Sequence, residues 1–152
     1  QQLVGLRYFN VYGPRQNPNG AYACVIPRWI LEMLNGIPTE IYGDGKTSRD
    51  FCYVTNTVQA NLLAATAKTA VGRVYNVAVE ARTSLNQLHR HLRRLTGNSQ
   101  KPAYKPFREG DPRHTLASTR AAKKDMGYHP THTLEQGLDL TVRWYANQAT
   151  TK

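Results

Sequence analysis

The sequence predicts a mixed α/β protein, because short apolar segments suited to β-strands alternate with longer segments that carry helix signals. The clearest helix covers residues 83–97, where Ser84 and Gln87 form a capping box and Gly97 marks the helix end. Leucines recur along this segment at helical spacing. A buried strand is expected at residues 71–79. The length of 152 residues suits one domain with a sizeable core.

The N-terminal half is expected to alternate between strands and helices. In the order strand, helix, strand, strand and helix, these elements cover residues 3–11, 25–36, 40–43, 48–54 and 55–68. Pro27 suits the first turn of its helix, and Gly36 suits the end of that helix. The turn Gly43-Asp44-Gly45 separates the second and third strands. The helix at residues 55–68 is rich in alanine, so it can pack closely against a sheet.

The C-terminal part contains an extended piece, a loop and two further helices. Prolines bound the extended piece at residues 101–106, and the loop "FREGDPRHT" follows it. A short helix then runs to Gly127. The last helix begins at Thr133, which has a capping-box partner in Gln136. The sequence contains no internal repeat and no low-complexity segment.

The composition is that of a soluble globular protein, with 40% hydrophobic and 20% charged residues. No apolar run reaches the roughly 20 residues of a membrane helix, so we expect no membrane partner. The formal net charge of +10 raises the alternative of nucleic-acid binding. The basic residues are dispersed, however, without an aromatic stacking platform or a reading motif. A phosphate-bearing small ligand explains them as well, and we expect no nucleic-acid partner.

Cysteine and histidine patterns predict neither a disulfide nor a metal site. Cys24 and Cys52 are the two cysteines, and their spacing is not that of a redox or metal-binding motif. We expect both to be buried thiols in a reducing compartment, the cytoplasm. His89 and His91 lie two residues apart on a helix, which points them to different faces. We therefore expect surface histidines and no metal.

Polar residues at predicted strand ends and in loops are the candidate binding residues. They are Asn10, Arg49, Arg108 and Asp111. Arg49 and Asp50 adjoin on a strand and therefore point to opposite faces, whereas Arg108 and Asp111 can form an ion pair within one turn. Two guanidinium groups suit a diphosphate, which each can hold with two hydrogen bonds. A carboxylate suits the hydroxyl groups of a ribose.

Four segments carry a resemblance to a known family. They are "LRYFNVYGPRQNPNGAYACVIPRW", "YGDGKTSRDFCYVTNTVQANLLAA", "VYNVAVEARTSLNQL" and "FREGDPRHTLASTRAAKKDMGY". In sequence and order they resemble the NAD-dependent epimerases and dehydratases of nucleotide sugars, which belong to the extended short-chain dehydrogenases/reductases. The resemblance extends from Leu3 to about Tyr145.

The resemblance implies that residues 1–152 are the C-terminal region of such an enzyme. The expected fold is the C-terminal part of a Rossmann-type sheet, interleaved with the small mixed α/β substrate-binding domain. The family's Gly-rich NAD loop, its catalytic Ser/Thr and its Tyr-x-x-x-Lys pair belong to the N-terminal half and do not occur here. Tyr42 does precede Lys46 by four residues, but in a turn whose context does not match. We therefore assign no catalytic residue and expect a fragment that is inactive alone.

The implied activity is epimerisation at C4 of a UDP-sugar, with interconversion of UDP-N-acetylglucosamine and UDP-N-acetylgalactosamine as the nearest match. NAD would be the cofactor, taking hydride from C4 and returning it to the other face. The complete enzyme is expected to be a homodimer. Two alternatives remain: dehydration or decarboxylation of a nucleotide sugar on the same fold, and a non-catalytic basic binding module.

The resemblance also implies roles for individual residues. Tyr8 and Phe9 would line the nicotinamide pocket, and Asn10 would hydrogen-bond the substrate. The remaining substrate contacts would be Val25 and Trp29 along the uridine-phosphate path, Tyr42 near the uracil, Arg49 and Arg108 at the diphosphate, Asp111 at the ribose, and Thr115 beside the C2 substituent of the sugar. Thr115 is small, so the resemblance implies room for an N-acetyl group there.

Overall fold

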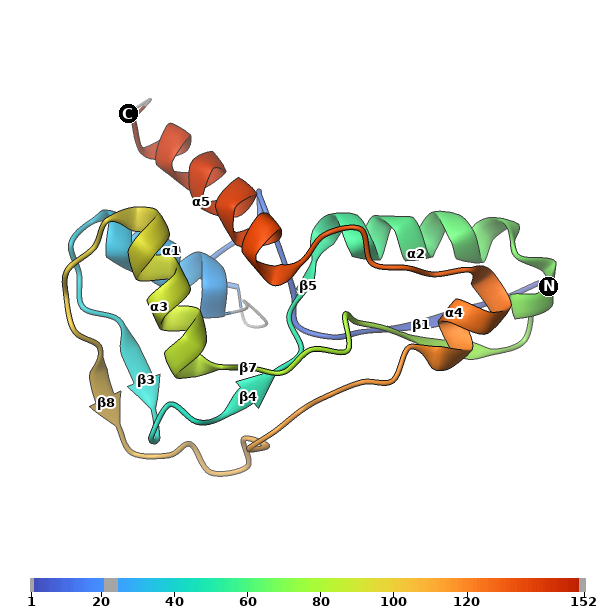
Figure 1. The fold of residues 1–152 in the computed structure, drawn as a ribbon, viewed down its shortest axis with the longest axis horizontal. Helices are drawn as coiled ribbons and strands as arrows, with labels where there is room; N and C mark the ends of the chain where they lie inside the picture. Colours follow the sequence, from blue (N-terminus) through green and yellow to red (C-terminus); the bar gives the residue numbers. More distant parts are fainter. Residues whose placement is uncertain (1, 21–24, 151–152) are drawn as a thin grey trace.

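The computed structural model describes residues 2–20 and 25–150, which form two lobes joined by short strands (Figure 1). One lobe contains β1 (Gly5–Tyr8), β6 (Val74–Val77), α2 (Val54–Thr66), the 3-10 helix η1 (Lys68–Ala70) and α4 (Arg120–Met126). The other contains α1 (Val25–Leu34), α3 (Leu85–Thr96), α5 (Leu134–Thr150), β3 (Glu40–Tyr42) and β8 (Ala103–Lys105). The chain passes between the lobes repeatedly, so neither lobe is a continuous stretch of sequence.

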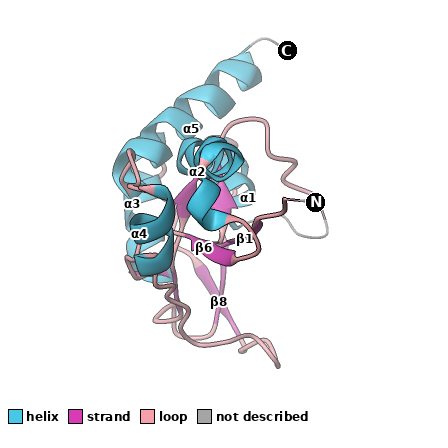
Figure 2. Cartoon of the chain, turned by 90° about the vertical axis from the view of Figure 1, so that its right-hand side faces the viewer, coloured by secondary structure: helices cyan, strands magenta, loops and turns pink. Residues whose placement is uncertain are grey.

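The first lobe is built on a parallel strand pair. β1 lies beside β6, with Gly5 opposite Val74 and Tyr8 opposite Val77. Both α2 and α4 contact β6, and Figure 2 shows α2 above the strand pair. The buried residues of this lobe form one cluster: Cys52, Ala60, Ala70, Tyr75, Val77, Ala122, Met126 and Tyr128. The predicted burial of Cys52 is confirmed, and Cys24 lies outside the described residues.

The second lobe packs three helices around a second core. Helix α3 contacts both α1 and α5, and β3 pairs in parallel with β8. Its core combines residues of the three helices and β3 with residues from the segments that join the lobes: Tyr12, Ile26, Trp29, Ile30, Met33, Ile41, Phe51, Tyr53, Leu88, Leu92, Leu138, Val142 and Tyr145. The predicted capping box of α3 is confirmed, and Gly97 ends that helix with a φ of 69°. Thr133 and Gln136 cap α5 in the same reciprocal way.

The first predicted strand is interrupted at Asn10. Instead of one strand over residues 3–11, β1 ends at Tyr8 and β2 (Val11–Tyr12) pairs in parallel with β5 (Cys52–Tyr53). Asn10 has a φ of 39°, a left-handed conformation that Asn tolerates better than most residues. Its side-chain nitrogen donates a hydrogen bond of 2.9 Å to the backbone oxygen of Asp50. Asn10 therefore turns the chain from one lobe toward the other.

The predicted strand at residues 48–54 is also divided, and Asp50 stands at the break. β4 (Ser48–Arg49) pairs antiparallel with β7 (Thr83–Ser84), and β5 then continues toward α2. The fully buried Asp50 carboxylate accepts backbone N–H groups of Val79 at 3.0 Å and Glu80 at 3.1 Å. Burial raises the pKa of Asp50 while these hydrogen bonds oppose the rise. Asp50 thus ties the end of β6 to the break between β4 and β5.

One histidine does not lie on the surface, contrary to the sequence-based expectation. His89 is 5% exposed and packs edge-on against Trp29, with ring centroids 5.8 Å apart. Burial, followed by the nearby Arg93 charge, lowers the pKa of His89. His89 therefore belongs to the contact between α1 and α3. In the described part of the chain, no helix has both the length and the apolar character that crossing a membrane requires.

Candidate functional site

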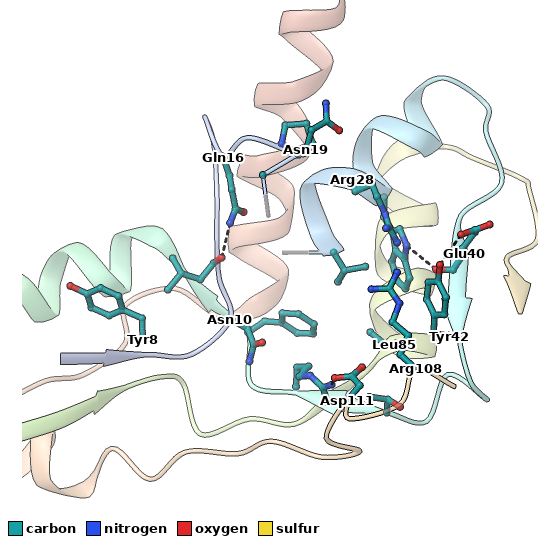
Figure 3. A pocket seen from close by; sticks show the side chains of 18 residues that line it. Tyr8, Asn10, Gln16, Asn19, Arg28, Glu40, Tyr42, Leu85, Arg108 and Asp111 are labelled. Carbon is teal, nitrogen blue, oxygen red and sulfur yellow. Dashed lines mark hydrogen bonds and ion pairs between the residues drawn. The ribbon is translucent and has the colours of Figure 1, made fainter. Parts of the chain in front are cut away.

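A cavity of about 1000 Å³ is the candidate site (Figure 3). It brings together eight of the residues that sequence reasoning selected: Tyr8, Asn10, Val25, Trp29, Tyr42, Arg49, Arg108 and Asp111. These residues come from β1, α1, β3, β4 and the loop after β8, so both lobes contribute. Figure 3 shows Tyr8 at one end of the cavity and Tyr42 with Arg108 at the other.

Arg49 is held at the cavity wall by two contacts. It donates from Nη1 to the backbone oxygen of Ser48 at 2.9 Å, and its Nη2 forms an ion pair with Asp111. The Arg49 side chain is 13% exposed and that of Asp111 is 47% exposed. Arg108 and Asp111, which the sequence allows to pair within one turn, do not form an ion pair among the described residues. Asp111 instead contacts an arginine that lies on a different element.

Arg108 stacks on an aromatic ring. Its guanidinium carbon lies 3.9 Å from the centroid of the Tyr42 ring, a cation–π contact. The Tyr42 hydroxyl donates to a Glu40 carboxylate oxygen at 3.3 Å, and Lys105 lies 3.4 Å from the other oxygen. One end of the cavity therefore combines a flat aromatic surface, a guanidinium group and a carboxylate.

The other end of the cavity is formed where β1 ends. The Tyr8 side chain is 51% exposed, and its hydroxyl donates to the Asn61 side-chain oxygen at 2.9 Å. The Asn10 amide nitrogen donates one hydrogen bond to the backbone of Asp50, which leaves its second N–H and its amide oxygen for a ligand. This position follows from the fold, because ligands of open α/β sheets bind beyond the carboxyl ends of the strands.

Val25 and Trp29 line the cavity from the first turns of α1. Trp29 is fully buried and donates from its indole nitrogen to the backbone oxygen of Glu40 at 3.2 Å. Trp29 therefore has a core-packing role and also forms part of the cavity wall.

Arg28 is a cavity residue that sequence reasoning missed. It lies three residues after Val25 on α1, and helical spacing from Val25 was the signal that could have found it. Its Nε lies 3.5 Å from the Glu32 carboxylate in the next turn. Burial raises the pKa of Glu32, and the Arg28 charge opposes that rise. Arg28, Arg49 and Arg108 thus place three guanidinium groups around one cavity.

Phe9 and Thr115 do not line the cavity. Phe9 donates its backbone N–H to Val77 at 3.1 Å and so continues the pairing of β1 with β6. Thr115 donates its backbone N–H to Ser48 at 3.1 Å. The Thr115 hydroxyl is buried and has no hydrogen-bond partner among the described residues. Both positions therefore contact the site only through their neighbours.

The cavity can bind an anion, but its described residues do not assemble an acid–base pair with a Tyr-x-x-x-Lys pattern. Lys46 lies in the turn after β3, where its N–H donates to Asp44 at 2.9 Å, and it does not line the cavity. Within residues 2–20 and 25–150, no cluster of three or more His, Cys, Asp or Glu is arranged to hold a metal ion. The chemistry supported by these side chains is therefore binding and orientation of a charged ligand.

Comparison with known proteins places this geometry in a family. The model of the NAD-dependent epimerase/dehydratase family matches residues 1–78. UDP-N-acetyl-alpha-D-glucosaminuronate decarboxylase of Bacillus cytotoxicus is 36% identical over 147 residues, which cover 92% of this chain and 45% of that protein. The chain therefore spans about half the length of the curated relatives it matches.

Two solved structures resemble the chain along nearly its whole length. UDP-glucose 4-epimerase of Thermotoga maritima, solved with UDP-glucose, has a TM-score of 0.89 and 41% identity over 97% of this chain and 46% of that one. UDP-N-acetylglucosamine 4-epimerase of Methanobrevibacter ruminantium, in complex with UDP-N-acetylmuramic acid, has a TM-score of 0.90 and 38% identity. The match covers 97% of this chain and 47% of that one. The predicted α/β class with Rossmann-type parallel strands is confirmed. The chain belongs to the NAD-dependent epimerase/dehydratase family.

Proposed function

We propose that the cavity binds a UDP-sugar and that the chain supplies the substrate-binding part of an NAD-dependent nucleotide-sugar 4-epimerase. The observation that carries this proposal is the convergence of Arg28, Arg49 and Arg108 on one cavity that also contains Asp111 and Tyr42. Its volume of about 1000 Å³ is at the upper end of the usual range for ligand pockets. Two similar proteins, solved with UDP-glucose and with UDP-N-acetylmuramic acid, support this ligand class.

Each proposed contact follows from the chemistry of the side chain. Arg49 and Arg108 would hold the diphosphate, since planar guanidinium groups bind phosphate oxygens in pairs. The Asp111 carboxylate would accept hydrogen bonds from the ribose hydroxyls. Tyr42 and Trp29 would border the uridine. Asn10 would contact the sugar through its amide oxygen or its second amide N–H. Arg28 is added to this set because it shares the cavity wall with Val25.

The described residues fit one end of NAD. Tyr8 lies at the carboxyl end of β1 with an exposed ring, which suits the border of a nicotinamide. NAD, when bound, would supply hydride transfer from and back to the sugar. The residues of this chain would hold and orient the sugar and exclude water from it. The base and the NAD phosphate loop are not among these 152 residues.

The finer proposal is that the sugar is N-acetylated. One relative acts on UDP-N-acetyl-alpha-D-glucosaminuronate, and one similar structure is a UDP-N-acetylglucosamine 4-epimerase. The ratio of kcat/KM for UDP-N-acetylglucosamine and UDP-glucose in the complete enzyme tests this preference. A ratio below one would contradict it. Thr115 is not included in the proposed pocket, because its hydroxyl is buried away from the cavity.

A second candidate reaction is decarboxylation, which the relationship to the Bacillus cytotoxicus enzyme favours. Product analysis separates the two reactions. An epimerase returns a sugar of unchanged mass, whereas a decarboxylase releases CO₂ from a UDP-hexuronate.

The proposal includes a reducing cytoplasmic setting, which the free thiol of Cys52 suits, and a homodimeric complete enzyme.

Calorimetric titration with UDP tests the proposed ligand. We expect UDP to bind, and uridine to bind far more weakly because it lacks the diphosphate that the guanidinium groups recognise. If the chain instead binds duplex DNA in a salt-dependent manner, and UDP does not displace the DNA, the chain is a basic binding module. Absence of UDP binding would overturn the proposal.

A further inference from the structure

Glu40 is an acid in the lining of a cavity that we expect to bind an anion. Its negative charge opposes a phosphate, because like charges repel. Among the described residues, its carboxylate forms no ion pair with an arginine of the cavity. Its partners are instead the Lys105 ammonium group, 3.4 Å from one carboxylate oxygen, and the Tyr42 hydroxyl, 3.3 Å from the other. These partners suit a role within the cavity wall and not a contact with the ligand phosphates.

The position of Glu40 is fixed at its backbone and at its carboxylate. The backbone oxygen accepts a hydrogen bond of 3.2 Å from the indole nitrogen of the buried Trp29. Lys105 reaches the carboxylate from β8, the strand that pairs with β3. Glu40 and Tyr42 are two residues apart on β3, so their side chains point to the same face of the strand. The Tyr42 hydroxyl therefore donates to an acceptor that is itself anchored.

Arg108 takes its position from the Tyr42 ring. Among the described residues, the Arg108 guanidinium forms no ion pair and no hydrogen bond, and its carbon lies 3.9 Å from the ring centroid. A cation is attracted to the face of an aromatic ring, so the orientation of the ring decides where the guanidinium lies. The hydrogen bond to Glu40 holds the far end of the ring and so restricts that orientation. Figure 3 shows Glu40, Tyr42 and Arg108 together at one end of the cavity.

We propose that Glu40 is a positioning residue of the diphosphate site, which acts through Tyr42 to hold the Arg108 guanidinium where a phosphate meets it. The inference rests on the proposed UDP-sugar site and adds to it a residue that binds no part of the ligand. It gives the acid in the cavity wall a function that outweighs its repulsion of the phosphates. Removal of the hydrogen-bond acceptor at Glu40 should therefore weaken binding of the diphosphate, whereas removal of the charge alone should not.

Calorimetric titration of Glu40→Gln and Glu40→Ala with UDP tests this role. Both variants lose the same charge, so the difference between them does not contain the electrostatic effect of that charge. Glutamine keeps a side-chain oxygen that can accept from the Tyr42 hydroxyl, whereas alanine has none. We expect Glu40→Gln to bind UDP at least as tightly as the unsubstituted chain and roughly threefold to tenfold more tightly than Glu40→Ala, the effect of one hydrogen bond. Uridine, which has no phosphate, should bind equally to the two variants.

Tyr42→Phe shows whether the effect passes through Tyr42. This variant loses the hydroxyl and keeps the ring, and on its own it should weaken UDP binding by a similar factor. Combined with each Glu40 variant, it should abolish the difference in UDP affinity between them. Tyr104→Phe is the matched control, because it removes a hydroxyl from the neighbouring strand β8, where that hydroxyl donates to Asn86 at 3.0 Å outside the cavity lining. We expect the difference between the Glu40 variants to persist when Tyr104→Phe is added.

Equal UDP affinity of Glu40→Gln and Glu40→Ala would overturn the proposal. So would a difference that persists with Tyr42→Phe, because Glu40 would then act by a route other than the ring. An equal loss of uridine affinity in Glu40→Ala would also overturn it, since the change would not be confined to the diphosphate. In all three cases UDP binding by the unsubstituted chain would still support the proposed function, whereas absence of that binding would reject both.

Discussion

Single arginines are expected to carry the affinity for a diphosphate. Arg49 and Arg108 reach the same cavity from elements that are far apart in the sequence, and each is oriented by a second contact. Their present partners are an acid and an aromatic ring, so a ligand meets guanidinium groups that are already positioned. Preorganisation of this kind increases affinity because fewer side chains must be ordered on binding.

Arg49→Ala and Arg108→Ala should each weaken UDP binding by about 1.5–3 kcal/mol, the scale of a hydrogen bond to a charged group. Arg→Lys should also lose affinity, because Lys cannot make the two-pronged contact. Arg73→Ala is the control: Arg73 is also paired with an aspartate, Asp125, but does not line the cavity. Calorimetry with unchanged UDP affinity in both cavity variants would remove these residues from the site.

Thr115 allows a prediction about stability. Its buried hydroxyl has no partner among the described residues, and such a group is destabilising. Thr115→Val should therefore raise the free energy of unfolding by about 1 kcal/mol. Thr141→Val is the control, since the buried Thr141 hydroxyl donates to the Gly137 oxygen at 2.6 Å, and its loss should destabilise. Urea unfolding measures both, and a destabilised Thr115→Val would show that the hydroxyl has a partner.

At the scale of elements, the turn after β3 supports the cavity. Gly43 has a φ of 82°, and a Cβ built there would lie 2.2 Å from the Phe107 ring. Phe107 directly precedes Arg108, so the turn and the cavity loop are packed against each other. Glycine at this position therefore permits the close approach that places Arg108 over Tyr42.

Gly43→Ala should lower the free energy of unfolding by about 1–2 kcal/mol, the cost of a left-handed alanine, and should also weaken UDP binding by displacing Phe107. Gly36→Ala is the matched control, because Gly36 has a φ of 69° but no atom near the position of a Cβ. We expect the control to lose similar stability and no UDP affinity. Equal UDP affinity in the two variants would show that the turn does not position the loop.

The contact between α1 and α3 should be sensitive to acid. His89 is buried against Trp29 with a lowered pKa, so the folded chain binds this proton less readily than the unfolded chain does. The stabilisation is complete above the ordinary histidine pKa of about 6.5 and is lost as the pH falls below it toward the folded-state value.

Thermal unfolding at about pH 7.5 and about pH 5.5 measures this effect, because the two values lie on either side of the ordinary histidine pKa. The unsubstituted chain should lose more stability on acidification than His89→Gln does. His129→Gln, at an exposed position, should behave like the unsubstituted chain. If His89→Gln loses as much stability on acidification as the unsubstituted chain, groups other than His89 cause the loss.

At the scale of the whole molecule, the two lobes close around the cavity but leave apolar surface uncovered. Leu3 is 66% exposed beside β1, and Val58 and Leu62 on α2 are 50% and 67% exposed. Parallel strands are usually covered on both faces, so this surface suits contact with further structure. This chain matches 45% of the Bacillus cytotoxicus relative, which is therefore about twice as long.

The polypeptide of 152 residues should show no epimerase turnover with NAD and UDP-N-acetylglucosamine. Substrate binding cannot replace the general base and the NAD phosphate loop, which are not among its residues. Product analysis by chromatography checks this, with UDP binding as the control for a folded site. Turnover by the pure polypeptide would contradict the prediction, whereas restored turnover on adding a polypeptide with the Gly-rich loop and Tyr-x-x-x-Lys would support it.

The sequence by itself determined the helices and the class of the protein. The capping box at Ser84 and Gln87 and the helix end at Gly97 are local features, because they depend on residues a few positions apart. The family resemblance selected the residues that gather at the cavity. The sequence placed the polar Asn10 at the end of its strand, but it did not reveal the left-handed backbone there, which is stabilised by a bond to Asp50, forty residues away.

Only the tertiary structure decided how the site residues pair. The loop after β8 lies against β4, so Asp111 meets Arg49 instead of Arg108, which stacks on Tyr42. The fold also buries His89, brings Arg28 to the cavity and keeps Thr115 away from it. Local sequence patterns describe the neighbours along the chain. Partners from separate elements depend on how those elements pack, and packing is a property of the whole chain.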